Sequence, residues 1–550
     1  MLKKLLATVM AVALLAGCVV GCQPAEDSDI PAASTTTEST TTTSTSRTTM
    51  STYYAGTPDA PNMPQFGGGG GSSSSTTKAP TGTTTKSPNI SFEPGSNRPV
   101  YRDNQELTIY AYAGPRSGGY QWQVDGQVPE DDPVGGWNTF VTEKDFMDYK
   151  NAGFTLLFPE YDAPYNSAET FKGSVLEDYM ELADQVGLDV LVYAPSLTEW
   201  TSGTAQMLTT TQKHFISSAI NKLKGYDSFY GLTMRDEPKD TAIDIYKAIA
   251  EYVNGIQPGL STLTAMLPIY GQRYLTGTYK NYIKNFGLAS GIFCYDFYPL
   301  QWNPKKGNYL KTQWYQNLEM AANTADDNDF DLGIIIQSCA FGPEGGYQKV
   351  DHARSVLTKA DVGFQLYTAL AYGVKTVGYF TYWQHRHDGH PHTSLRFYDA
   401  MVMYPEKNGQ PAVKTDTYYA VQAANNEVKK FDHVLMNFEW QGTMALKKTD
   451  EFGILSEIAS YKPLNIGSAS ATADAIIGHL KDSAGNDGYM IVNSVEPSKN
   501  VTSKVTVNFK GATAAIAYVK GEETTIMLQD GNYTFNLGAG EGVFVIPYIA

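Results

Sequence analysis

The chain has 550 residues, of which 42% are hydrophobic and 12% are aromatic, which is enough for a large core and at least one further folded unit. Its 41 basic and 57 acidic side chains give a formal net charge of −16. A chain this acidic lacks the counterion release that drives binding to a phosphate backbone, so the composition excludes nucleic acid as a partner and favours neutral, stackable ligands such as sugars.

The N-terminus has the pattern of a secretory signal. Two lysines precede an apolar run, residues 5–16, that is too short to span a membrane. The run leads into Leu15-Ala16-Gly17-Cys18, which resembles the cleavage box of bacterial lipoproteins, where the cysteine becomes the lipidated N-terminus. We therefore predict a lipoprotein signal over residues 1–22 and a lipid on Cys18 that holds the protein at the outer face of a bacterial membrane. Cys22 is the second candidate, and an ordinary signal peptide is the alternative.

Residues 23–97 are dominated by Ser, Thr and Gly. This composition buries too little apolar surface to offset the loss of chain entropy on folding. The segment is therefore predicted to be a disordered spacer that holds the folded part away from the membrane.

From about residue 107 short apolar runs alternate with amphipathic stretches, a pattern typical of parallel β/α architecture. Strands are expected at 107–112, 154–158, 189–193, 229–234, 261–266, 291–295, 332–336 and 376–381. Helices are expected at 143–151, 175–186, 214–223, 242–253, 279–286, 314–324, 362–371 and 416–431. Eight such strands predict a (β/α)8 TIM barrel over residues 98–437. A doubly wound open sheet is the alternative, although it usually has fewer strands and the chain has no G-x-G-x-x-G turn.

Beyond residue 437 the hydrophobic period changes to two. Apolar runs at 488–492, 504–508 and 543–547 are separated by Gly, Asn and Asp turns. A C-terminal antiparallel β-sandwich is therefore predicted over residues 438–550. The two cysteines of the predicted folded region are too few for a disulfide framework or a cysteine-ligated zinc site.

The end of the fourth predicted strand carries an acidic motif, Arg235-Asp236-Glu237-Pro238. Reactive residues of TIM barrels gather at such strand ends. The motif resembles the strand-four Asn-Glu-Pro of clan-A glycoside hydrolases, which implies that Glu237 is the general acid/base. Asp236 stands where the family has the asparagine that helps to hold the sugar 2-hydroxyl. Adjacent acids raise the pKa of one of them, which suits a proton donor. A solvated acidic turn before a helix is the alternative.

Two more strand ends extend the resemblance. The segments Cys294–Pro299 and Gly378–Trp383 are similar to parts of β-galactosidase-type clan-A barrels, including glycoside hydrolase family 42. The resemblance implies an oligo- or polysaccharide substrate and no cofactor. It also implies substrate contacts from Arg235, Asp236 and Tyr298, with Trp383 as the floor of a sugar subsite.

The seventh strand departs from that family, whose nucleophile is a glutamate at this strand end. The present chain has Ile335-Ile336-Gln337-Ser338, and Gln337 can contact a substrate but cannot be a carboxylate nucleophile. Hydrolysis needs a second carboxyl group about 5–9.5 Å from the first, depending on its stereochemistry. Asp296 is the preferred candidate because a strand end positions a side chain better than a loop does. Glu344 and Glu160 are the other candidates, and a role of Asp296 in orienting a neighbouring side chain is the alternative.

The segment 385–392 holds four of the chain's 8 histidines. Dense imidazoles next to a carboxylate suit a metal. No histidine ends another predicted strand, however, so we expect no metal and expect His385 and His387 to contact sugar hydroxyls. A metal site and a solvated loop are the two alternatives.

Two functions of different classes follow from these patterns. The first is a surface-anchored glycoside hydrolase that cleaves O-glycosidic bonds of an extracellular glycan by carboxylate acid/base catalysis. The second is a glycan-binding lipoprotein whose barrel has lost its nucleophile. An enzyme that cleaves another kind of bond is a third interpretation, because a fold does not fix a function.

Overall fold

The computed structural model describes residues 90–102, 105–115, 142–159, 163–343, 352–354, 356–383, 395–398, 400–403 and 413–550. The predicted signal, Cys18 and nearly all of the predicted spacer lie outside the described residues. So do four residues named as candidates above: Glu160, Glu344, His385 and His387.

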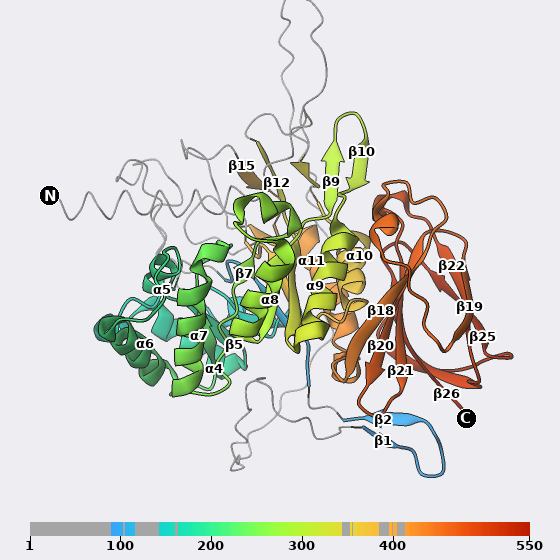
Figure 1. The fold of residues 1–550 in the computed structure, drawn as a ribbon, viewed down its shortest axis with the longest axis horizontal. Coiled ribbons are helices and arrows are strands. Elements are labelled where there is room, and N and C mark those ends of the chain that lie inside the picture. The colour runs from blue at the N-terminus through green and yellow to red at the C-terminus, as the bar shows by residue number, and fades with distance from the viewer. Residues whose placement is uncertain are drawn as a thin grey trace, which may run out of the picture. The chain divides into compact units, whose positions relative to one another are not determined.

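The barrel is a parallel eight-stranded sheet (Figure 1). In chain order its strands are β3 (Thr108–Ala111), β4 (Leu156–Leu157), β5 (Asp189–Tyr193), β6 (Phe229–Thr233), β7 (Ala265–Met266), β8 (Ile292–Asp296), β11 (Asp331–Gln337) and β14 (Thr376–Phe380). They are hydrogen-bonded in the order β6-β5-β4-β3-β14-β11-β8-β7. This order keeps chain neighbours side by side around the sheet, which confirms the predicted TIM barrel.

The two ends of this order meet at Gly231 of β6 and Ser261, which precedes β7. The amide N of Leu232 donates to the Ser261 carbonyl O at 3.0 Å. A Cβ on residue 231 would lie 2.0 Å from that oxygen, so the close approach requires glycine. Further along, the Met234 amide donates to the Thr264 hydroxyl at 3.0 Å instead of to a backbone carbonyl. This side-chain bond explains why β7 is shorter than the predicted strand.

Helices alternate with the strands, and their ends follow capping signals. The helices are α2 (Glu143–Asn151), α3 (Ala168–Phe171), α4 (Val175–Val186), α5 (Pro195–Trp200), α6 (Thr210–Leu223), α7 (Ile243–Ile256), α8 (Tyr279–Ser290), α9 (Trp314–Asn328), α10 (Lys359–Leu370), α11 (Asp416–Val428) and α12 (Asp432–Leu435). Helix α4, for example, begins after Ser174, whose hydroxyl accepts from Glu177 N, and ends at Gly187 with φ +70°. The observed α2, α4 and β5 have the predicted bounds.

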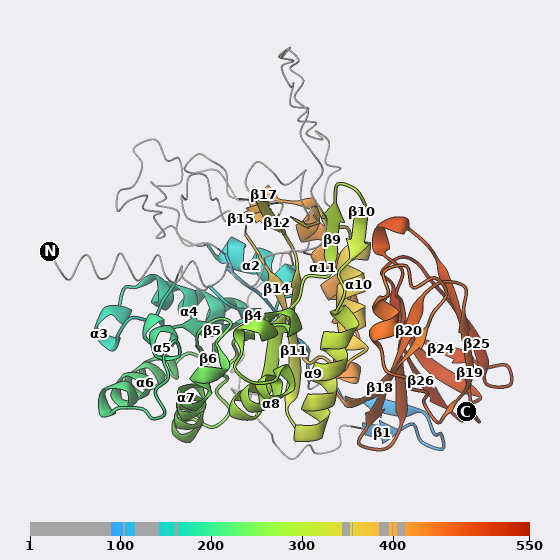
Figure 2. The same ribbon diagram turned by 45° about the horizontal axis from the view of Figure 1, so that its top comes forward.

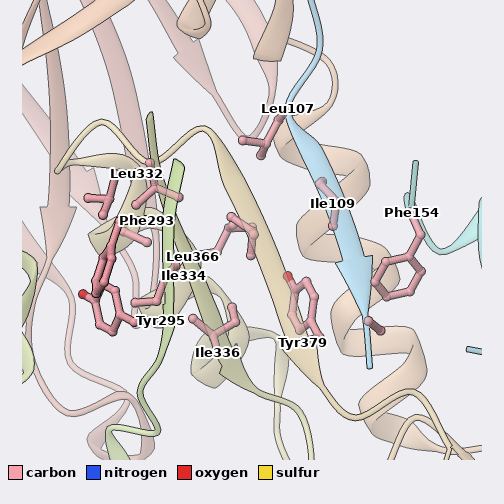
Figure 3. Close-up of a cluster of buried hydrophobic side chains, with 14 of the residues drawn as sticks. Leu107, Ile109, Phe154, Phe293, Tyr295, Leu332, Ile334, Ile336, Leu366 and Tyr379 are labelled. Carbon is pink, nitrogen blue, oxygen red and sulfur yellow. The ribbon is translucent and has the colours of Figure 1, made fainter. Parts of the chain in front are cut away.

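Barrel strands bury both faces because helices cover the outside and side chains fill the inside. Outward residues of β3, β8, β11 and β14 pack against the helix layer, as Figure 3 shows for Ile109, Tyr295, Ile334 and Tyr379. The interior is filled by a separate cluster rich in aromatic residues: Tyr110, Tyr112, Leu156, Phe158, Leu191, Tyr193, Leu263, Ala265, Cys294 and Ile335.

The C-terminal part forms two antiparallel sheets, which confirms the predicted sandwich. One sheet has the order β18-β20-β21-β26-β23-β24 and the other β19-β22-β25. Their bounds are β18 (Phe438–Leu446), β19 (Ile466–Ala471), β20 (Ala475–Asp482), β21 (Asp487–Asn493), β22 (Ser503–Phe509), β23 (Ala514–Val519), β24 (Glu522–Met527), β25 (Asn532–Leu537) and β26 (Gly542–Tyr548).

Alternate residues of the larger sheet serve two cores. Ile477 and Ile491 face the second sheet, whereas Ile476 and Val492 join the core formed with the barrel helices. Helices α9 and α10 lie between the barrel strands and this sheet in both views (Figure 1, Figure 2). The sandwich is therefore packed on the barrel through a continuous apolar layer.

Short strands complete the described chain. They are β1 (Ile90–Phe92), β2 (Pro99–Tyr101), β9 (Leu300–Asn303), β10 (Gly307–Leu310), β12 (Ala340–Pro343), β13 (His352–Ala353), β15 (Leu395–Tyr398), β16 (Val402–Met403) and β17 (Val413–Lys414). The β1–β2 hairpin is tied to the sandwich because Tyr101 Oη donates to Asp482 Oδ2 at 2.9 Å. Among the described helices, none combines the length and the apolar character that crossing a membrane requires.

Candidate active site

Glu237 lies in the turn that follows β6, at the carboxyl end of the barrel strands. Its backbone has φ +44°, a left-handed conformation that costs a non-glycine residue about 1–2 kcal/mol. The turn is held on both sides, because the Glu237 amide donates to Ala265 O at 2.9 Å and Tyr282 Oη donates to Pro238 O at 2.8 Å. Strain that the surroundings maintain in this way is typical of functional sites.

Asp296 is the last residue of β8 and is 6% exposed. Cys294, two residues earlier, belongs to the cluster inside the barrel, so alternation along the strand directs Asp296 toward the barrel axis. Its carboxyl group lies close enough to that of Glu237 for the charge of Asp296 to raise the pKa of Glu237. Asp296 Oδ1 is buried and has no hydrogen-bond partner among the described residues. The ends of β6 and β8 therefore bring two carboxyl groups together, and Asp296 Oδ1 can still accept a hydrogen bond.

Both carboxyl groups hold their protons more tightly than usual. Burial raises the pKa of Glu237 well above its ordinary value, and the negative charges of Asp296 and Asp236 raise it further. Burial and the charge of Asp236 also raise the pKa of Asp296, to about 7. Because two like charges close together cannot both ionise easily, the pair titrates as a unit, and its first ionisation leaves one proton shared by the two carboxyl groups.

Three cationic or polar side chains surround the pair. Arg235 lowers the pKa of Glu237, and its Nη1 donates to Ser202 Oγ at 2.8 Å. Lys311 lowers the pKa of Asp296, and its Nζ lies 3.7 Å from the centroid of a tyrosine ring. Tyr112 Oη donates to Asp236 Oδ1 at 3.4 Å. Lys311 and Tyr112 were not among the site residues predicted from the sequence. An aromatic at the end of the first strand could have signalled Tyr112, whereas no pattern marks Lys311.

Gln337 is the last residue of β11, so the structure places an amide where clan-A barrels have their nucleophile. The side chain is fully buried, and its Nε2 donates to Arg354 O at 3.0 Å. Its backbone exchanges two hydrogen bonds with the Gln365 amide, at 2.9 and 3.2 Å. Gln337 Oε1 is buried without a partner among the described residues. The amide is thus oriented by its nitrogen and retains a free acceptor.

The predicted sugar-contacting aromatics are buried. Tyr298 is 6% exposed and packs against Phe380, with ring centroids 5.9 Å apart. Trp383 is 2% exposed and its backbone bridges to Val402. Their roles in substrate binding stay predictions. Cys294 and Cys339 are both buried free thiols. Within the described ranges no group of three His, Cys, Asp or Glu side chains is arranged to hold a metal ion.

No protein-family model matches the chain, and no curated protein matches it. Solved structures that resemble it include glycoside hydrolases. An α-amylase from Anoxybacillus has 10% identity and a TM-score of 0.40, with 81% of this chain and 98% of that chain covered. A β-galactosidase from Marinomonas ef1 has 10% identity and a TM-score of 0.41, with 60% and 62% covered. A β-L-arabinopyranosidase from Geobacillus stearothermophilus has 9% identity and a TM-score of 0.41, with 81% and 97% covered. These likenesses are of fold alone.

Proposed function

We propose that this protein is a glycoside hydrolase in which Glu237 is the general acid and Asp296 the second carboxylate. One observation carries the proposal, namely the carboxyl pair at the ends of β6 and β8, in which Asp296 is buried and the pKa of Glu237 is raised well above its ordinary value. A protonated carboxyl group beside an ionised one is the arrangement that glycoside hydrolysis requires. The left-handed backbone of Glu237 supports it, since the fold maintains strain at that residue.

In the proposed reaction the glycoside binds between the two carboxyl groups, which glycosidases hold roughly 5–9.5 Å apart. Glu237 then donates its proton to the glycosidic oxygen as the bond to the anomeric carbon breaks. Asp296 acts on the opposite side, either on the anomeric carbon directly or by taking a proton from the attacking water.

Gln337 favours the second candidate, a barrel that binds a glycan without cleaving it. An amide at the end of β11 cannot attack carbon or activate water, and its nitrogen is already bonded to Arg354 O. Under this alternative the carboxyl pair would accept hydrogen bonds from sugar hydroxyls, and no step would need the proton of Glu237.

A panel of aryl glycosides and polysaccharides, incubated with the purified protein, distinguishes the two candidates. Release of the aryl group or of reducing ends supports hydrolysis, and binding without release supports the glycan-binding alternative. Asp296→Asn should abolish release. If Asp296→Asn stays active while Glu344→Gln is inactive, the second carboxylate is Glu344 and its assignment to Asp296 is wrong.

We further propose that the enzyme acts outside the cell while anchored through lipid on Cys18. The Leu15-Ala16-Gly17 run before Cys18 supports this location. Cys18→Ser should release the protein from the membrane fraction. Unchanged partitioning, tested also with Cys22→Ser, would contradict the anchor.

A further inference from the structure

Arg354 lies at the centre of a buried ionic network. Its guanidinium is bonded through Nη1 to Asp361 and through Nη2 to Glu496. The exposed fractions of the three side chains are 6%, 4% and 1%, so water barely screens these charges. A buried fork of this kind fixes the position of the arginine, because an unpaired buried charge is strongly unfavourable.

The backbone of Arg354 meets the candidate active site on two sides. Its amide N donates to Leu300 O at 3.0 Å, four residues beyond Asp296. Its carbonyl O accepts from Gln337 Nε2 at 3.0 Å. Arg354 therefore joins the chain that follows β8 to the side chain that ends β11, although its own side chain points into the ionic network.

The two carboxylates of the network come from different parts of the chain. Asp361 belongs to the first turn of α10, where its side chain also accepts from the backbone N of Thr358 at 2.9 Å. Glu496 follows β21 of the sandwich, and it is held there by hydrogen bonds from Ser498. One of the two carboxylates that fix Arg354 is therefore supplied by the sandwich.

We propose that Arg354 and Glu496 are positioning residues through which the sandwich orients the Gln337 amide at the active site. Glu496 holds the guanidinium, the guanidinium holds the Arg354 backbone, and the Arg354 carbonyl fixes the Gln337 nitrogen. The Gln337 Oε1 is then left as an oriented acceptor for a substrate hydroxyl. This last step rests on the proposed function, whereas the chain of contacts from Glu496 to Gln337 does not.

Hydrogen exchange of the full chain, followed by mass spectrometry, tests the contacts without a substrate. Glu496→Gln keeps the size of the side chain and removes its charge. We expect exchange in the peptides that contain Arg354 and Gln337 to accelerate by about 10- to 100-fold, because the backbone they share is no longer fixed. Ser494→Ala is the matched control. It lies on the same sandwich loop and removes only the hydrogen bond to Tyr315 Oη on α9.

A second variant tests whether the change in exchange comes from the ionic network and not from a general loss of stability. Arg354→Lys keeps a positive charge but loses the two-pronged fork, and it should accelerate exchange in the same peptides. If both variants accelerate exchange only in the sandwich, or no more than Ser494→Ala does, the proposal is wrong.

Kinetics with an aryl glycoside that the wild type cleaves add a second readout. Glu496→Gln should raise KM about 10-fold and leave kcat within about 2-fold, since the loss is one of substrate orientation. In a Gln337→Ala background the same change should have no further effect on KM, and an additive effect would overturn the proposal. If the wild type cleaves no glycoside while the exchange result holds, the proposed function fails and the positioning contacts stand.

Discussion

The rim of the barrel differs sharply between the ends of β6 and β8 and the end of β11. On the first side, Asp296 is buried, Glu237 is half-buried, and desolvation raises the pKa of both carboxyl groups. The backbone of Glu237 also lies in the left-handed region. On the second side, Gln337 is neutral and its nitrogen and backbone are all hydrogen-bonded to the scaffold. Unfavourable charge and strain persist only where the structure maintains them. This difference supports the proposal that β6 and β8 supply the reacting groups and that β11 orients the substrate.

The largest effect is expected from Glu237→Gln. The amide keeps the size and the hydrogen bonding of the side chain but has no acidic proton, so hydrolysis of a glycoside with a poor leaving group should fall about 10²- to 10⁴-fold. An activated aryl glycoside should lose less, because its leaving group needs little protonation. Steady-state kinetics with both substrate types measure the difference. Glu251→Gln, at an exposed position of α7, is the control. Equal losses on both substrates would contradict the assignment of Glu237 as the general acid.

A smaller effect, on stability, is expected from Asp296→Asn. An ordinary aspartate loses its proton near pH 4, whereas the pKa of Asp296 in the folded protein is raised to about 7. The folded state therefore binds more protons between these values, and its stability falls as the pH rises through them. The free energy of unfolding of the asparagine variant should exceed that of the wild type by about 4 kcal/mol at pH 8 and match it near pH 4. Urea unfolding at both pH values checks this, and a constant difference would show that ionisation of the buried Asp296 carboxyl group is not the cause.

At the end of β11, replacing the amide by a carboxyl group should lower the stability of the protein. Gln337→Glu places a carboxylate against the Arg354 carbonyl, where the wild-type amide donates a hydrogen bond. We expect a loss of about 1–2 kcal/mol at pH 8 and a smaller loss at pH 5, where a protonated glutamate can again donate. Urea unfolding measures both values. A variant as stable as the wild type at pH 8 would mean that the β11 end accepts a carboxylate as readily as β8.

The smallest effect is expected from Ser202→Ala. It removes the hydrogen bond from Arg235 Nη1, which is exposed to solvent, and water can replace it. Stability should stay within about 0.5 kcal/mol and KM within about 2-fold of the wild type. A larger rise in KM would show that the orientation of Arg235 matters as much as the carboxyl pair.

Strand ends were predictable because the hydrophobic period fixes where a strand leaves the core. The sequence thus placed Glu237, Asp296 and Gln337 at the ends of separate strands, in agreement with β6, β8 and β11. The effect of Asp296 on the pKa of Glu237 was not predictable, since it depends on how closely the barrel closes at Gly231. Nor was the pairing of Arg354 with Glu496, which are 142 residues apart in the chain. Local sequence patterns specify helices and strands, whereas contacts between residues far apart in the chain depend on the tertiary packing.

The aromatic filling of the barrel makes Cys294 a reporter of barrel opening. Its thiol lies within 3.6 Å of Tyr110 Oη, has no exposed surface, and burial raises its pKa to about 12. Alkylating reagents react with the thiolate form of cysteine. In the native protein the Cys294 thiol is therefore both inaccessible to them and protonated. The rate at which Cys294 becomes labelled therefore measures how often the strands part, and it does so in the unmodified chain.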